Sequence, residues 1–373
     1  MNALPEKAVL VGFQWKKHPE VDGLDSLKEL ESLLLTAGGV AEERFLVSLE
    51  KIVPATFIGS GKVEEIRDTA SEREVGLVVF DCELSPTQLR NLEEAIGARV
   101  IDRTQLILDI FAQHAHSREG KIQVELAQLN YLLPRLVGAG KSLSRTGGGI
   151  GTRGPGETRL EVQRRRIRLK ITGLKKELQR VEKQRSIRRQ NRLRHNVPIV
   201  SIAGYTNSGK STLLQALSKD TDIECEDALF VTLSPVSRKV HGPDGKEAVF
   251  NDTVGFIQNI PHTIIQAFHA TLEEIRLSDL VVHLVDLSDP LYARRLSESL
   301  KVLEEIEAGD LPRLLVFNKI DQVDPETLQV AKEKYPDACW ISARTGEGMK
   351  QLLAQLFSLL AGENFARETV PGH

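Results

Sequence analysis

An apolar run that leads directly into a glycine-rich loop and then a helical pattern constrains this chain more than any other feature. Residues 199–203 read Ile-Val-Ser-Ile-Ala, which is typical of a buried strand. Gly204–Ser211 then matches G-x-x-x-x-G-K-S, and Thr212–Leu217 has helical spacing. Strand, loop and helix in this order predict an α/β domain with a parallel sheet. Because the glycines let successive backbone N–H groups turn inward, the loop predicts a phosphate site.

The loop and the first turn of the helix contain the residues expected to hold a nucleotide. We expect Lys210 to bridge the β- and γ-phosphates and the Ser211 hydroxyl to ligate Mg²⁺. The other expected contacts are Gly204, Asn207, Ser208, Gly209 and Thr212. In GTPases that bind K⁺ near the transferring phosphate, an asparagine occupies the position of Asn207. Potassium held through Asn207 is therefore an additional hypothesis.

Two motifs further along the chain are expected to recognise the base of the nucleotide. Asn318-Lys319-Ile320-Asp321 follows the apolar run Leu314–Phe317 and matches N-K-x-D. The Asp321 carboxylate can accept hydrogen bonds from two adjacent N–H donors of guanine, which adenine does not present. Ser342-Ala343-Arg344 resembles the loop that caps the base, with the Ala343 amide facing guanine O6. Together with the phosphate loop, these motifs predict GTP and GDP as ligands.

The segment Asp252-Thr253-Val254-Gly255 matches D-x-x-G and predicts the γ-phosphate contacts. Asp252 would hold the Mg²⁺ shell, and the Gly255 amide would meet the γ-phosphate. Thr232 is the best candidate for the threonine that closes on Mg²⁺ when the γ-phosphate is present. We therefore expect Ser211, Thr232 and Asp252 at the metal, and catalytic roles for Lys210, Thr232 and Gly255.

The residue after Gly255 is Phe256, where Ras-like enzymes place the glutamine that orients the attacking water. A phenyl ring cannot hydrogen-bond that water. We therefore expect a GTPase with a low intrinsic rate, whose site is completed by a partner, an ion or another residue.

Although the whole chain is nearly neutral, with a net charge of −3, one of its segments is strongly basic. Residues 159–195 carry 15 Lys and Arg against three acids, and Leu160, Ile167, Leu174 and Val181 recur every seven residues. This spacing predicts a long helix with an apolar seam. Because solvated helices usually interleave acids with bases, the excess favours a polyanion-binding arm over a solvated coiled-coil face.

We expect this arm to pair with an antiparallel helix over Lys121–Val137 and to contact RNA through its phosphates. The connecting residues 144–156 contain six glycines and Arg145 and Arg153. They form either a flexible connector or a basic loop whose backbone approaches RNA closely. The predicted RNA contacts are Arg145, Gly147, Gly148, Gly149, Arg153, Arg164, Arg165, Arg166, Arg168, Lys175 and Lys176.

Upstream of the arm, apolar runs alternate with helical patterns. Residues 8–13, 45–49, 75–81 and 99–102 are typical of strands, and 24–36, 61–71 and 85–96 of helices. This alternation predicts a small, largely parallel α/β domain. We expect an N-terminal α/β domain at 1–115, a helical hairpin arm at 116–195, a Ras-like P-loop GTPase domain at 196–362 and a tail at 363–373.

Composition narrows the function classes further. With 41% hydrophobic and 27% charged residues, the chain is neither collagenous nor wholly disordered. Its three isolated cysteines exclude a disulfide framework, and no apolar run reaches the roughly 20 residues that span a bilayer. We expect a cytoplasmic protein, with peripheral membrane association as an alternative, and nothing in the sequence requires more than a monomer.

The order of these domains resembles HflX, a family of ribosome-associated GTPases. The resemblance covers about residues 24 to 360. Its signatures are Thr56–Lys62, Asp81–Pro86, Ile101–Thr104, Gln123–Leu129, the Gly147–Glu157 loop and Asp252–Ile257. It implies a factor that binds the large ribosomal subunit and 23S-type rRNA, inserts its hairpin near the peptidyl-transferase centre, and splits or rescues stalled 70S ribosomes, notably after heat stress. It implies no DNA partner.

Two other functions stay open at this point. A ribosome-assembly or RNA-modification GTPase would use the same arm to hold precursor RNA and would prefer immature particles. A non-ribosomal regulatory switch would direct the arm to an acidic membrane surface or a protein partner.

The segment Gly59-Ser60-Gly61-Lys62 raises the question of a second nucleotide site, because ATP-dependent activity has been attributed to this region of the family. A phosphate loop would need glycine at Thr56 and a hydroxyl at Val63. The segment is therefore better interpreted as a turn into a helix.

Overall fold

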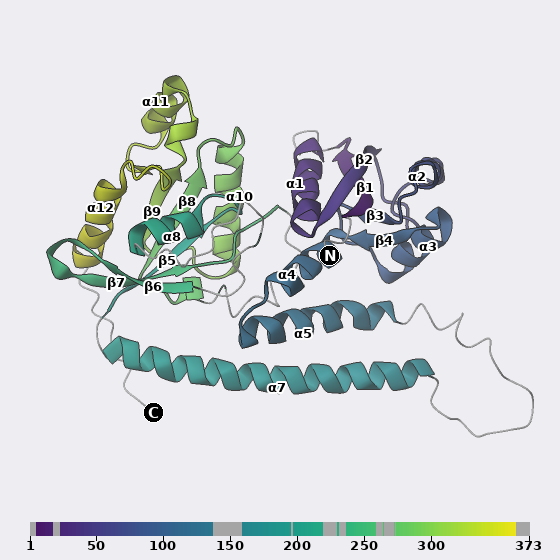
Figure 1. Cartoon of the computed structure of the whole chain (residues 1–373), viewed down its shortest axis with the longest axis horizontal. Coiled ribbons are helices and arrows are strands. Elements are labelled where there is room, and N and C mark those ends of the chain that lie inside the picture. The colour runs from purple at the N-terminus through teal and green to yellow at the C-terminus, as the bar shows by residue number, and fades with distance from the viewer. Residues whose placement is uncertain are drawn as a thin grey trace, which may run out of the picture. The chain divides into compact units, whose positions relative to one another are not determined.

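The computed structural model describes residues 5–17, 23–136, 159–194, 197–218, 230, 236–258, 264, 272 and 274–362. It divides into two units (Figure 1). The N-terminal unit comprises Met1–Gln184 and Gln258–Phe268, and the C-terminal unit comprises Arg185–Ile257 and His269–His373. The chain therefore passes from the C-terminal to the N-terminal unit between Ile257 and Gln258.

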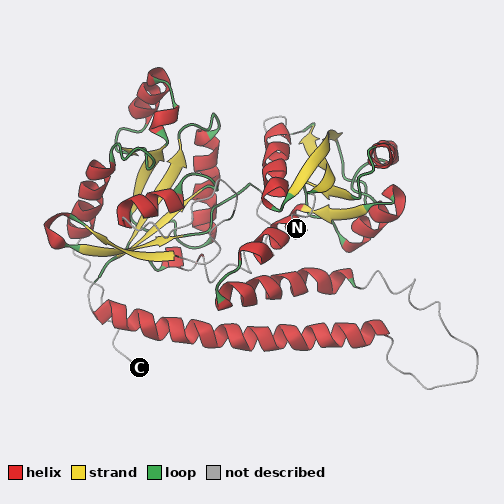
Figure 2. Cartoon of the chain, in the orientation of Figure 1, coloured by secondary structure: helices red, strands yellow, loops and turns green. Residues whose placement is uncertain are grey.

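The N-terminal unit is built on a four-stranded parallel sheet with the order β2-β1-β3-β4. The strands are β1 (Glu6–Trp15), β2 (Gly39–Leu49), β3 (Leu77–Phe80) and β4 (Arg99–Asp102), connected by helices α1 (Gly23–Thr36), α2 (Ser60–Glu72) and α3 (Pro86–Ile96). The alternation of red helices and yellow strands is visible in Figure 2. This confirms the predicted parallel α/β arrangement, although β2 begins six residues earlier than expected.

Local signals in the sequence explain where these helices begin. The Ser85 side chain accepts from the Gln88 amide while the Gln88 side chain accepts from the Ser85 amide, and Pro86 opens the helix. This reciprocal cap satisfies donors that the first turn leaves unpaired. Gly59 occupies the corresponding position before α2, so Gly59–Lys62 turns into a helix, as expected.

One described helix of the N-terminal unit was not predicted. Helix α4 (Arg103–His114) follows β4 directly, and the Asp102 side chain caps it by accepting from the Gln105 amide at 2.8 Å. Its side chains are buried on most sides, so no apolar stripe marks it as a surface helix. Asp102 also accepts from the Tyr131 hydroxyl at 2.8 Å and from Arg135 at 3.0 Å, which joins α4 to the next helix.

The predicted hairpin arm consists of α5 (Arg118–Arg135) and α7 (Arg159–Arg194). Ion pairs join Arg118 to Glu177 and Glu125 to Lys170. The residue number of the partner on α7 decreases as the residue number on α5 increases, so the two helices are antiparallel. They lie side by side in Figure 1. Ile171 and Leu174 of the apolar seam are buried. Helix α5 starts three residues earlier than predicted and ends two residues sooner.

The C-terminal unit has a six-stranded sheet with the order β10-β9-β8-β5-β7-β6, in which only β6 runs antiparallel to its neighbour. The strands are β5 (Ile199–Gly204), β6 (Val236–His241), β7 (Glu247–Asp252), β8 (Leu280–Asp286), β9 (Arg313–Asn318) and β10 (Cys339–Trp340). The helices are α8 (Lys210–Ser218), α10 (Tyr292–Glu305), α11 (Pro325–Lys334) and α12 (Met349–Gly362), with short 3₁₀ helices η1 (Pro243–Gly245) and η2 (Ile320–Gln322). The predicted fold class is confirmed.

Strand β5 lies at the centre of this sheet and is fully buried. Its side chains pack with those of α8, α12 and the flanking strands, including Leu213, Phe250 and Leu356. A central strand buried on both faces needs an uninterrupted apolar run, which is why residues 199–203 carry so clear a signal. Within the described residues, no helix combines the length and apolarity needed to cross a membrane.

Candidate nucleotide-binding site

The sequence motifs of the C-terminal unit meet at one edge of its sheet. Ile202 of β5 pairs with Asp252 of β7, and Asp286 of β8 pairs with Asn318 of β9. The phosphate loop leaves the carboxyl end of β5, whose neighbours β7 and β8 lie on opposite sides. Ligands of open α/β sheets bind at such a point, because the connections diverge there and leave a crevice.

The phosphate loop has the backbone that its glycines predict. Gly209 has a φ of 91°, and a Cβ on it would lie 2.4 Å from the Asn318 amide nitrogen. A side chain at this position would therefore be both strained and too close. Asn207 also has a positive φ, 59°, a conformation that asparagine tolerates better than most residues. Ser208 is fully buried and Thr212 lies in the first turn of α8.

Lys210 is buried beneath this loop. Its ammonium group donates to the Tyr205 carbonyl at 2.8 Å, and only 7% of the residue is exposed. Burial lowers the pKa of Lys210 to about 8, because the charged form loses hydration, while the nearby Asp252 carboxylate opposes that shift. Without a ligand, burial therefore destabilises the charged form of Lys210. The negative charge of a bound phosphate would stabilise it.

Ser211 and Asp252 form the metal-binding half of the site. The Ser211 hydroxyl donates to Asp252 Oδ2 at 2.6 Å. A hydroxyl and a carboxylate at this spacing are the oxygen donors that Mg²⁺ prefers, so these residues fit the ion. Thr232, the third expected ligand, lies outside the described residues.

Gly255 lies directly against the phosphate loop. A Cβ on Gly255 would be 2.8 Å from the Lys210 ammonium nitrogen and 2.7 Å from Thr206 Cγ2. Gly255 and the Lys210 side chain therefore lie close together, as expected for two groups that contact the same γ-phosphate.

Phe256 pairs with the phosphate loop in a way that the sequence did not reveal. The Thr206 amide donates to the Phe256 carbonyl at 2.7 Å, and the Phe256 amide donates to the Gly204 carbonyl at 3.1 Å. The residue is only 1% exposed, so its ring belongs to the packed interior. The position that holds a water-orienting glutamine in Ras-like enzymes serves here to join the two segments.

Asn318 organises the part of the site where the base is expected. Its side-chain amide donates to the Ser208 carbonyl at 2.8 Å, and its side-chain oxygen accepts from the Ala343 amide at 2.9 Å. It therefore connects the phosphate loop to the segment that begins at the buried Ser342. Lys319 forms an ion pair with Asp286 at 2.6 Å. Asp321 lies exposed in η2, open to a donor from a ligand.

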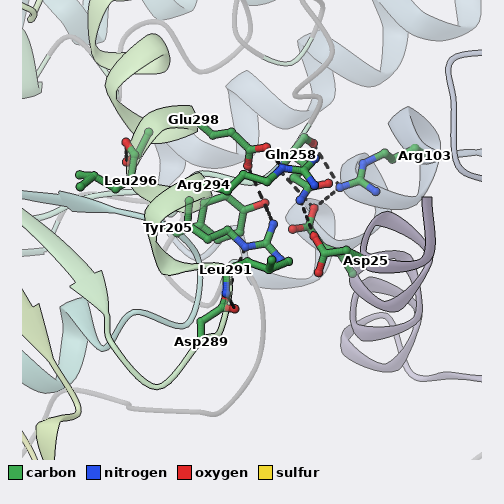
Figure 3. A network of polar contacts seen from close by, with 12 residues as sticks. Asp25, Arg103, Tyr205, Gln258, Asp289, Leu291, Arg294, Leu296 and Glu298 are labelled. Atoms are coloured by element: carbon green, nitrogen blue, oxygen red, sulfur yellow. Dashed lines mark hydrogen bonds and ion pairs between the residues drawn. The ribbon is translucent and has the colours of Figure 1, made fainter. Parts of the chain in front are cut away.

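Tyr205 and Arg295 form a further contact that no motif identified. The Arg295 guanidinium lies 4.4 Å from the Tyr205 ring centroid and donates to its hydroxyl at 2.8 Å. Asp289 accepts from Arg295 at 3.2 Å; Tyr205 and Asp289 are labelled in Figure 3. The partners lie 90 residues apart in sequence, so only the fold brings them together.

The predicted RNA contacts divide between described and masked parts of the chain. On α7, Arg165, Arg166, Arg168, Lys175 and Lys176 are exposed and Arg164 is half-buried. Arg145, Gly147, Gly148, Gly149 and Arg153 lie outside the described residues. The described part of the arm therefore presents a cationic surface.

A phosphate loop on a central parallel strand, with the D-x-x-G segment against it and N-K-x-D at the end of β9, two strands away in the same sheet, defines the class of P-loop GTPases. Comparison with family models agrees. Residues 199–319 match a family described as 50S ribosome-binding GTPase. Residues 24–112 match GTP-binding GTPase N-terminal, and residues 114–192 match GTP-binding GTPase Middle Region.

Relatives cover almost the whole chain. GTPase HflX of Lacrimispora saccharolytica is 45% identical over 99% of this chain and 86% of its own length. GTPase HflX of Escherichia coli K12 is 44% identical over 96% of this chain and 84% of its own length. A solved complex of a protein called SsGBP with GDP is 25% identical, covers 95% of this chain and 98% of its own, and has a TM-score of 0.51. The chain belongs to the GTPase HflX family, which confirms the resemblance drawn from its motifs.

Proposed function

We propose that this GTPase binds the large ribosomal subunit through its cationic arm and dissociates or rescues stalled 70S ribosomes, under stress such as heat. The observation that carries the proposal is the exposed basic surface of α7 on the same chain as a GTPase domain. The description of the matched family as 50S ribosome-binding supports the choice of partner. We propose 23S-type rRNA as the contacted component, and a cytoplasmic monomer as the acting form.

The proposed nucleotide roles follow from the site. Lys210 and the amides of the loop hold the phosphates, Gly255 meets the γ-phosphate, and Asp321 with the Ala343 amide reads guanine. Ser211, Asp252 and Thr232 would hold Mg²⁺, which would neutralise charge that develops on the phosphates. Because Phe256 is buried and offers no polar side chain, we propose that contact with the ribosomal particle completes the site.

The proposed RNA role rests on charge. Each arginine or lysine of α7 that neutralises an rRNA phosphate releases condensed counterions, so binding should weaken steeply as salt rises. Ile171 and Leu174 are buried in the hairpin, which leaves the basic positions available on the other faces of α7.

Potassium remains a separate hypothesis about the same site. We propose that Asn207 helps to bind K⁺ beside the transferring phosphate, which would supply charge where the usual glutamine is missing. Equal GTP turnover in NaCl and KCl would exclude it.

Ribosome dissociation tests the proposed function. Purified 70S ribosomes are mixed with the protein and GTP, a non-hydrolysable GTP analogue or GDP, and the subunits are separated on sucrose gradients. We expect free subunits with GTP and with the analogue, and intact 70S with GDP. Intact 70S particles under all three conditions would refute ribosome splitting.

A further inference from the structure

A groove in the N-terminal unit is lined by arginines from two helices that are distant in sequence. Arg90 comes from α3, and Arg164 and Arg168 come from α7. The groove has a volume of about 670 Å³, within the roughly 300–1,000 Å³ that sites for small molecules occupy. All of its lining residues belong to the N-terminal unit, in which Figure 1 labels α3, α5 and α7. The groove is therefore a feature of one unit.

The positive charges of this groove are not balanced by acids. Among the described residues that line it there is no carboxylate. Arg164 and Arg168 form no ion pair within the described part of the chain, and Arg164 Nε is buried there without a hydrogen-bond partner. Arg90 pairs with Glu94 at 3.8 Å. Because three like charges in one hollow repel one another, the groove is suited to an anionic ligand.

The remaining surface of the groove is largely apolar. We define the apolar wall as Pro86, Leu133 and Pro134, which come from the start of α3 and the end of α5. Pro86 and Leu133 are half-buried, and Thr87 adds one hydroxyl to the groove. A ligand that fills the groove must therefore combine negative charge with an apolar or aromatic face.

An RNA nucleotide combines these two properties, because it carries a phosphate and a flat base. Guanidinium groups bind phosphates through paired donors and also stack on flat rings. The face of the base is accessible in single-stranded RNA, whereas in a duplex it is stacked between neighbours. An acidic peptide supplies charge without a flat face. The chemistry of the groove therefore favours an unpaired nucleotide.

We propose that the groove binds one unpaired nucleotide of RNA, with its phosphate at the arginines and its base against the apolar wall. The inference rests on the proposed function and deepens it, because Arg164 and Arg168 are among the predicted RNA contacts. It adds α3 and the end of α5 to the RNA-binding surface. The arm then binds RNA together with a helix of the α/β domain.

Fluorescence anisotropy of the full chain with three labelled probes tests the ligand class. The probes are hexauridylate, an abasic ribose-phosphate hexamer of the same charge, and hexaglutamate. We expect wild-type protein to bind hexauridylate at least about fivefold more tightly than the abasic hexamer, because stacking of a base adds to the phosphate contacts. Equal affinity for these two probes would overturn the inference. Hexaglutamate binding as tight as that of hexauridylate would also overturn it, in favour of an acidic protein partner.

Two variants with matched controls separate the two parts of the groove. Arg90→Gln should weaken binding of both nucleic-acid probes by about three- to tenfold and reduce the slope of log affinity against log salt by about 0.7. Its control is Arg67→Gln, at an exposed position on α2 outside the groove. Leu133→Ser shortens the apolar wall and should weaken binding of hexauridylate alone. Its control is Leu132→Ser, at an exposed position of the same helix outside the groove.

Both controls should bind the probes as the wild type does. Equal losses in a variant and its control, or a loss in Leu133→Ser that extends to the abasic hexamer, would overturn the inference. Sedimentation with large ribosomal subunits distinguishes its failure from that of the proposed function. A wild-type protein that binds subunits but not hexauridylate would overturn the groove assignment alone. A wild-type protein that binds neither would refute the proposed RNA-binding role of the arm.

Discussion

At the scale of single residues, the buried Lys210 makes nucleotide binding depend on pH. Its pKa of about 8 means that half of the unliganded protein carries the charge at pH 8. Phosphates favour the charged form, so binding raises the pKa and takes up about half a proton at that pH. We expect GDP affinity to fall as the pH rises through 8, by about tenfold between pH 7 and pH 9.

Calorimetry at pH 8 in two buffers of different ionisation enthalpy measures this proton uptake. A binding enthalpy that is the same in both buffers would contradict the pKa and its cause. Lys210→Ala should lose productive GTP binding, and because it removes the titrating group, any GDP binding that it retains should show no proton uptake at this position.

Asp321 determines the preference for guanine in this account. Asp321→Asn replaces one acceptor oxygen by a donor group, which suits the xanthine ring better. We expect GDP affinity to fall and XDP affinity to rise, each by at least about tenfold, because a site built for hydrogen bonds rejects a mismatched partner strongly. Asp337→Asn, also an exposed aspartate, should leave both affinities unchanged. An unaltered ratio in Asp321→Asn would remove this residue from the base site.

At the scale of elements, Asp102 joins β4, α4 and α5. It caps α4, accepts from Tyr131 and pairs with Arg135, and it is completely buried. Asp102→Ala should lower the free energy of unfolding by about 3–5 kcal/mol, because it leaves a cation and several donors without their partner. Ser85→Ala, which removes only one cap, should cost about 1 kcal/mol. Denaturant unfolding of both variants measures the difference, and equal losses would show that Asp102 is only a cap.

Helix α7 carries the proposed RNA contacts. Replacing Arg164, Arg165 and Arg166 together by Gln should weaken binding to the large subunit and reduce the slope of log affinity against log salt by about 2 to 3. Lys332→Gln with Lys334→Gln, on the exposed face of α11, is a matched basic control. Sedimentation at several salt concentrations gives both quantities. An unchanged slope in the triple variant would assign docking to another surface.

The elements also show which features a sequence reveals. Strands of both sheets, the hairpin, and the place of the phosphate-loop and N-K-x-D motifs at strand ends were predictable because their signals are local: an apolar run, a cap, or a motif within a few residues. Helix α4 was missed because burial on most sides removes the helical stripe. The buried cluster that Arg103 forms with Glu29, Asp81 and the Gln258 carbonyl was missed because its members are distant in sequence, and such pairs leave no local pattern.

At the scale of the whole molecule, the chain joins a GTPase domain, whose buried Phe256 lies where Ras-like enzymes have a glutamine, to a long cationic arm. A single partner would account for both features, because the particle that binds the arm would also supply the group that the GTPase site lacks. The free protein would then hydrolyse GTP slowly, and the protein bound to the correct particle would hydrolyse it rapidly. Hydrolysis would therefore depend on binding of the arm.

GTP turnover tests this coupling most directly. The rate is measured for the protein alone and with saturating mature large subunits, 70S ribosomes, immature particles, free rRNA or anionic vesicles. We predict a large stimulation confined to mature subunits and whole ribosomes. Stimulation by immature particles alone would indicate an assembly factor, and stimulation by none of these partners would contradict the account.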